Sequence, residues 1–174
     1  MIRYLIGIDP GVNTGISVWD RKRQRVEDLA VMSYWEAIEF VERFSPKNTE
    51  LRIEDPDQIS HVWDRPMPAG AGKYLPASEL MIHHVRRGQM GAFIATMRKL
   101  IKIAQNVGMN KCDGKRLIEY FRLKGYTVKA VNPKNLGKKW THAQFVMYTG
   151  LRDAEYKKKK YQHAIDGCRL VVGY

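Results

Sequence analysis

Four side chains in this sequence have the chemistry of metal ligands or acid–base groups. Asp9 and Glu54 each follow an apolar run and precede a proline-containing turn, and His163 and Asp166 stand three residues apart near the end of the chain. Residues at that spacing are neighbours on a helix surface. Carboxylate oxygens favour Mg²⁺ or Mn²⁺, and two such ions about 4 Å apart can drive phosphodiester hydrolysis. If the four side chains converge, we expect a divalent-metal site that acts on phosphodiester bonds.

The same residues also have ordinary structural interpretations. An Asp before Pro-Gly is typical of a turn cap, which would leave Asp9 without a chemical role. On the helix predicted at the end of the chain, His163 and Asp166 lie opposite the apolar stripe. That position is typical of a solvated helix face as well as of an open cleft. The choice between these interpretations depends on the elements that carry the residues.

Apolar segments separated by turn signals predict an α/β fold, with a mixed five-stranded sheet flanked by helices in a single domain over residues 1–174. Asp9 and Glu54 would end two strands, at the edge where α/β sheets carry their ligands. The later order of strand, helix, helix and strand indicates a parallel arrangement. Strands are predicted at 1–8, 16–19, 26–32, 50–53 and 126–131, and helices at 33–44, 88–107, 113–125, 141–150 and 153–172.

The net charge of +12 indicates a polyanionic partner, which would be DNA, RNA or an anionic membrane surface. No apolar run approaches the roughly 20 residues of a membrane span, and the N-terminus lacks a signal-peptide pattern. The two cysteines, Cys112 and Cys168, belong to no metal-spaced set and predict reduced thiols. We therefore expect a cytoplasmic protein with no membrane partner.

Basic residues after the last predicted strand are candidates for contacts with phosphates. Lys134, Lys138 and Lys139 lie in the loop that follows this strand. Lys159 belongs to a run of four lysines, which is typical of a solvated face, but it shares a helix side with His163.

Residues 57 to about 77 are predicted to form a long irregular loop, because three prolines and two glycines fall within them. Loops of this length are usually functional or mobile. Trp63 and Tyr74 would either stack on unpaired bases or pin the loop to the body of the protein. Arg65 and Lys73 are further candidates for DNA contacts.

Four parts of the chain match, in order, the motifs of one known family. Gly7-Ile8-Asp9-Pro10-Gly11, with Thr14-Gly15 behind it, is similar to an opening strand, and Ile53-Glu54 to a second acidic strand end. Gly88-Gln89 is similar to a Gly-Gln pair on a long helix, and His163-Ala164-Ile165-Asp166-Gly167 to a closing motif. Over nearly the whole chain, this ordered set resembles the RuvC-type Holliday junction resolvases.

The resemblance implies an RNase H-like fold, a homodimer, and cleavage of four-way DNA junctions by paired symmetric nicks. It implies two Mg²⁺ or Mn²⁺ ions per active site and family lysines near the scissile phosphate, matched by Lys134 and by Lys138 or Lys139. The short, lysine-rich chain resembles the phage-encoded branch, which would act in the cytoplasm of a bacterium or an infected cell. The residues carried over as catalytic and metal-binding are Asp9, Glu54, His163 and Asp166.

Two departures from the family pattern bear on specificity. The loop after Glu54 looks longer than usual for the family, which affects the expected junction specificity. His163 stands where many members have an acid, and imidazole tolerates Mn²⁺ more readily than Mg²⁺.

Three other functions compete with junction resolution. A related nuclease would act on flaps, other branched DNA or structured RNA, because phosphate contacts position a nucleic acid without identifying it. An actin-like or sugar-kinase ATPase also opens with a strand, an Asp and a glycine, but it needs two domains and a second glycine-rich turn that this chain lacks. A non-catalytic junction-binding protein would use the acids for structure alone.

Overall fold

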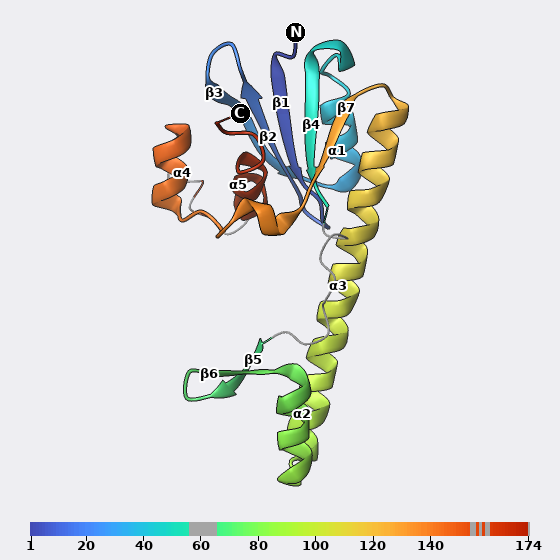
Figure 1. The fold of residues 1–174 in the computed structure, drawn as a ribbon, viewed down its shortest axis with the longest axis vertical. Helices are drawn as coiled ribbons and strands as arrows, with labels where there is room; N and C mark the ends of the chain where they lie inside the picture. Colours follow the sequence, from blue (N-terminus) through green and yellow to red (C-terminus); the bar gives the residue numbers. More distant parts are fainter. Residues whose placement is uncertain (56–65, 154–155, 157, 159–160, 174) are drawn as a thin grey trace. The chain divides into compact units, whose positions relative to one another are not determined.

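The computed structural model describes residues 1–55, 66–153, 156, 158 and 161–173 (Figure 1). The chain divides into two compact units, Met1–Gln58 together with Asn110–Tyr174, and Ile59–Met109. The single domain expected over residues 1–174 stays a prediction. Among the described residues, no helix is both long and apolar enough to cross a membrane.

The first unit is built on a mixed five-stranded sheet with the strand order β3-β2-β1-β4-β7. The first three strands pair antiparallel, whereas β4 is parallel to both β1 and β7. With helices on both faces, this is the predicted α/β, RNase H-like fold. The strands are β1 (Tyr4–Asp9), β2 (Thr14–Asp20), β3 (Arg25–Met32), β4 (Thr49–Glu54) and β7 (Thr127–Val131).

One face of the sheet is covered by α1 (Tyr34–Val41) and by the C-terminal part of α3 (Met90–Leu123). A capping box between Ser33 and Glu36 begins α1, as the sequence predicts. Strand residues alternate between faces, so Ile6 and Ile8 both point into this layer. The buried cluster consists of Ile6, Ile8, Ile16, Val18, Ala37, Ile38, Val41, Leu51, Ile53, Leu117, Ile118, Phe121 and Tyr126.

The opposite face is covered by α4 (His142–Thr149) and α5 (Gln162–Cys168) (Figure 1). The predicted capping box of Thr141 and Gln144 begins α4, and Gly150 closes it in the left-handed conformation. The buried cluster on this face consists of Leu5, Trp19, Val26, Phe145, Ile165, Cys168, Leu170 and Val171.

Two predictions about the helices were wrong. A single continuous helix, α3, replaces the two helices expected on either side of Gly108 and Asp113. An isolated glycine in a helix costs only about 1 kcal/mol and does not by itself end it. The last helix, α5, ends at Cys168 rather than at Val172, because the chain turns there with i→i+3 hydrogen bonds from the Leu170 amide to the Gly167 carbonyl and from the Val171 amide to the Cys168 carbonyl. Much of the predicted N-terminal part of this helix, residues 154, 155, 157, 159 and 160, lies outside the described residues.

The second unit differs from the predicted loop. Its described part is a hairpin of β5 (Pro66–Gly70) and β6 (Lys73–Pro76), followed by α2 (Ala77–Arg86) and by the N-terminal part of α3 up to Met109. Prolines are compatible with a two-stranded hairpin because both strands are edge strands. This unit has its own small core of Met67, Ala77 and Leu80, with Leu75, Leu100 and Ile103 packed against it.

Candidate active site

Asp9 and Glu54 end two adjacent parallel strands. In the register of β1 and β4, Ile8 is paired with Ile53, so the next residue of each strand is one of the two acids. The side chains of both acids are therefore presented at the same edge of the sheet. This placement confirms the strand-end positions that the sequence predicts.

The last helix reaches that edge because two glycines let its backbone lie directly on the strands. A Cβ atom on Gly7 would be 2.1 Å from the carbonyl oxygen of Gly167, and one on Gly15 would be 2.1 Å from the carbonyl carbon of His163. Cβ atoms do not approach backbone atoms this closely, so neither position can accept a side chain without displacing α5. The glycines thus bring the closing motif onto the ends of β1 and β2.

His163 contacts Asp9 directly, with 2.7 Å between Nδ1 and Oδ2. This hydrogen bond raises the pKa of His163 above its ordinary value, against the opposing effect of burial. At Asp9, by contrast, burial has the largest effect and raises the pKa of the carboxyl, although the hydrogen bond to His163 acts in the other direction. Two of the four predicted residues therefore form one pair, which joins the strand end to α5.

Asp166 is almost completely buried, with 2% of its side chain exposed. Its carboxylate accepts hydrogen bonds from Lys139 Nζ, from Gln162 Nε2 at 3.2 Å and from Arg169 Nη1 at 3.3 Å. This environment excludes the solvated-face interpretation for Asp166. The residue belongs to the interior of the site, where the basic loop and the last helix meet.

Glu54 shares the electrostatic environment of the other acids. Burial and the neighbouring carboxylates of Asp9 and Asp166 raise the pKa of Glu54 to about 7, while Lys139 and Arg169 act in the opposite direction. A carboxyl group that is hard to ionise beside two other acids marks a site with too little positive charge.

The donor chemistry of this cluster fits a hard divalent cation. Asp9, Glu54 and Asp166 offer carboxylate oxygens, and a bound cation would offset the burial and the repulsion that together raise the pKa of Glu54. Within the part of the chain that the structure describes, no three His, Cys, Asp or Glu side chains already form a metal-binding group. Basic side chains hold two of the acids instead, since His163 contacts Asp9 and Lys139 contacts Asp166.

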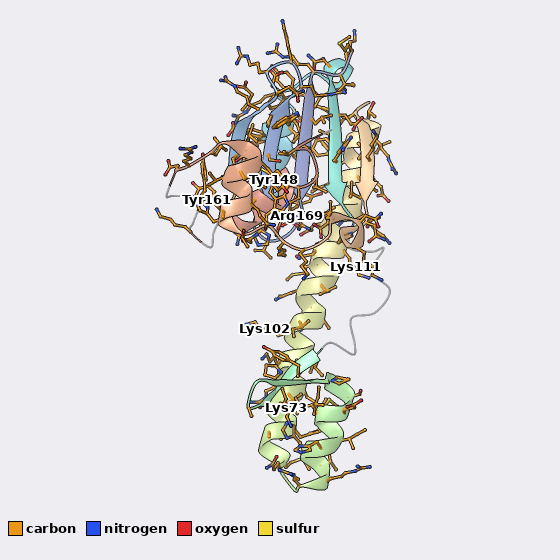
Figure 2. All side chains as sticks on the ribbon, turned by 60° about the vertical axis from the view of Figure 1, so that its left-hand side comes forward. Lys73, Lys102, Lys111, Tyr148, Tyr161 and Arg169 are labelled. Atoms are coloured by element: carbon orange, nitrogen blue, oxygen red, sulfur yellow. The ribbon has the colours of Figure 1, made fainter. Side chains whose placement is uncertain are left out.

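The other predicted contact residues fall into three places. Lys134, Lys138 and Lys139 are all exposed in the segment after β7. Lys139, with 67% of its side chain exposed, contacts Asp166 of the acid cluster. Lys73, labelled in Figure 2, and Tyr74 belong to β6 in the second unit, where Tyr74 is exposed. Trp63, Arg65 and Lys159 lie outside the described residues.

Sequence reasoning missed two residues that bind Asp166. Arg169 stands three residues after Asp166 and Gln162 four residues before it. The helical spacing that paired His163 with Asp166 would have found both. Neither residue was among the predicted site residues.

No family model matches this sequence, and a search of curated proteins finds no match. Among solved structures, the chain is similar to "T. thermophilus RuvC in complex with Holliday junction substrate", with 13% sequence identity and a TM-score of 0.40. The similarity covers 96% of this chain and 88% of that chain. The fold and the site described above rest on the topology and contacts of the chain itself.

Proposed function

We propose that this chain is a divalent-metal-dependent endodeoxyribonuclease that resolves four-way DNA junctions by paired symmetric nicks. One observation carries the proposal. The four acid and imidazole groups come from β1, β4 and α5, yet they gather at one edge of the sheet in a chain of charge +12. Such a collection of acids in a basic protein is costly unless cations and a polyanionic substrate compensate it.

In this proposal the acids hold metal and the basic segment holds DNA. Asp9, Glu54 and Asp166, completed by His163, would bind Mg²⁺ or Mn²⁺, which supplies an activated water and stabilises the leaving oxygen. The contact between His163 and Asp9 keeps the Asp9 carboxylate pointing into the site. Lys139 stands exposed beside Asp166 and would meet the phosphate next to the scissile bond.

The remaining basic and aromatic residues would extend the DNA contact. Lys134 and Lys138 are exposed in the segment after β7, which contacts the acid cluster through Lys139, and would neutralise neighbouring phosphates. The other proposed contacts are Lys159, Trp63, Arg65, Lys73 and Tyr74.

The proposed partner is a second copy of the chain. Each chain carries one acid cluster, and two symmetric nicks in one junction require two such clusters in a fixed relation. We place this homodimer in the cytoplasm of a bacterium or of a phage-infected cell.

The test is the cleavage of a labelled immobile four-way junction, beside flap and linear duplex substrates, with Mg²⁺, Mn²⁺ or EDTA. Asp9→Asn should retain junction binding and lose cleavage, because it keeps the size of the side chain and removes its charge. Asp28→Asn is the matched control, since Asp28 is exposed on β3. We expect this control to cut normally.

Metal-dependent paired nicks in the junction alone, lost in Asp9→Asn, would support the proposal. Equal cutting of flaps or duplex would replace it with a broader nuclease. Tight junction binding without cutting in either metal would leave a DNA-binding protein and overturn the enzymatic assignment.

A further inference from the structure

Arg169, labelled in Figure 2, directly follows α5. Its contacts link the acid cluster to the basic segment after β7. Its Nη1 donates to Oδ1 of Asp166 at 3.3 Å. Its Nη2 donates to the carbonyl oxygens of Leu136 and Gly137, both at 2.8 Å. One guanidinium therefore binds a proposed metal-binding carboxylate and two carbonyls that lie about thirty residues earlier in the chain.

The burial of this contact is unusual for an arginine. Only 5% of the Arg169 side chain and 2% of the Asp166 side chain are exposed. Burying two charges carries a desolvation penalty that an apolar pair of similar size would avoid. The forked guanidinium, however, can bond a carboxylate and two carbonyls at once, which no apolar side chain can do.

The bound segment leads directly to Lys139. Asn132 caps the 3-10 turn Pro133–Leu136 by accepting a hydrogen bond from the Lys134 amide, and Gly137 ends the turn with a φ of 67°. Two residues later, the Lys139 ammonium binds Oδ2 of Asp166. Both oxygens of one carboxylate are therefore tied to the same segment, one through Arg169 and the other through Lys139.

We propose that Arg169 is a positioning residue that holds the segment Leu136–Lys139 against Asp166 and so places Lys139 at the reacting phosphate. That Arg169 holds the segment follows from its contacts with the two carbonyls and does not depend on the proposed function. The effect of the segment on cleavage rests on the proposed function. Arg169 touches no substrate in this scheme. It acts through the carbonyls that it holds and through the carboxylate that it orients.

The conservative variant Arg169→Lys tests this role. A lysine keeps a positive charge beside Asp166, but its single ammonium cannot reproduce the planar fork that spans the carboxylate and both carbonyls. We expect the NMR backbone order parameters of residues 136–139 to fall below about 0.6, because the anchoring of their carbonyls is lost. The order parameters of β1 and β2 should stay unchanged.

Cleavage should slow when the segment becomes mobile. Removing a group that orients a metal-binding or phosphate-binding side chain typically lowers activity about 10- to 100-fold. We expect a loss of that size in the single-turnover rate on a four-way junction, with the junction Kd changed less than about threefold. Arg21→Met, at an exposed hairpin position, is the matched control and should alter neither measurement.

A second pair of variants covers the case in which a variant of Arg169 does not fold. Asp166→Asn alone leaves the contacts of Arg169 with both carbonyls, so the backbone of the segment should stay ordered. Asp166→Asn combined with Arg169→Met removes both buried charges together, which avoids an unpaired charge in the interior. The double variant should lower the backbone order parameters of residues 136–139, and equal order parameters in the two variants would overturn the positioning role.

The outcomes separate this inference from the proposed function. If the wild-type protein cuts no DNA, the proposed function fails, while the backbone order parameters still decide whether Arg169 holds the segment. If the wild-type protein cuts and Arg169→Lys cuts equally fast with a loosened segment, the positioning role in cleavage is overturned.

Discussion

The imidazole Nδ1 of His163 lies 2.7 Å from Oδ2 of Asp9, although the two residues are 154 positions apart. This contact crosses from the last helix to the first strand and lies inside the proposed metal site. Because of this contact, the protonation of His163 depends on the charge of Asp9. This dependence can be measured in the absence of substrate.

The pKa of His163 is expected to lie above its ordinary value in metal-free protein, because the Asp9 carboxylate stabilises the imidazolium. A raised folded-state pKa gives stability that is fully present below the unfolded-state pKa and is lost as pH rises through the folded-state pKa. NMR titration of the imidazole in EDTA measures this shift. Asp9→Asn should bring the His163 pKa down, and an unchanged titration in that variant would show that Asp9 is not its partner.

Substitution of Gly15 by alanine should displace α5. The new Cβ atom would meet the backbone of His163 at 2.1 Å, and backbone atoms cannot move aside as a flexible side chain can. We expect a loss of about 3 kcal/mol or more in unfolding free energy, together with loss of cleavage.

Gly91→Ala is the matched control for this substitution. Gly91 lies in α3 with open space around its Cβ position, so the alanine should stabilise the helix by about 0.5–1 kcal/mol. Urea unfolding compares the two variants. A Gly15→Ala protein as stable and active as the control would mean that α5 does not need direct contact with the strands.

The sheet was predictable because its strands are short apolar runs with turn signals between them, and the acids at two strand ends followed from that pattern. The burial of Asp166 was not predictable. Its helical position opposite an apolar stripe indicates solvent, but the basic segment after β7 folds over it with Lys139 and is tied there by Arg169. Such a contact depends on tertiary structure and leaves no periodic pattern in the sequence.

The hairpin of the second unit was missed for a different reason. Three prolines and two glycines argue against a strand inside a sheet, but β5 and β6 form a two-stranded ribbon in which each strand has a free edge. The turn at Ala71 and Gly72 requires positive φ angles at both residues, and the alanine gives no signal for this. The residue composition of this stretch therefore predicted a loop, although its two segments pair and form a two-stranded ribbon.

Glu54 should make the metal-free protein less stable as pH rises. Its folded-state pKa of about 7 lies above the ordinary value of 4.5, so the stability present below that ordinary value is lost as pH rises through about 7. Glu54→Gln cannot ionise and should be more stable than the wild type in EDTA at pH 8. With screening of a partly exposed group, we expect a difference on the order of 1–2 kcal/mol.

The measurement for Glu54 is urea unfolding at pH 5 and at pH 8, with EDTA or with Mg²⁺. The two proteins should have similar stability at pH 5 and diverge at pH 8. Addition of Mg²⁺ should stabilise the wild type more than the variant, because the ion binds the ionised carboxylate. Equal pH dependence in both proteins would place Glu54 outside the cluster of interacting acids.

The basic segment after β7 should contribute to the salt dependence of junction binding. Each phosphate contact that a lysine makes releases counterions, so removing one contact lowers the slope of log K against log salt by about 1. Lys134→Ala and Lys138→Ala are each expected to show this change, measured by fluorescence anisotropy of a labelled junction. Lys47→Ala is the control, because Lys47 is exposed in the turn that precedes β4, at the other end of that strand from Glu54. If all three variants keep the wild-type slope, DNA does not follow the segment beside the acid cluster, and the proposed path of the substrate is wrong.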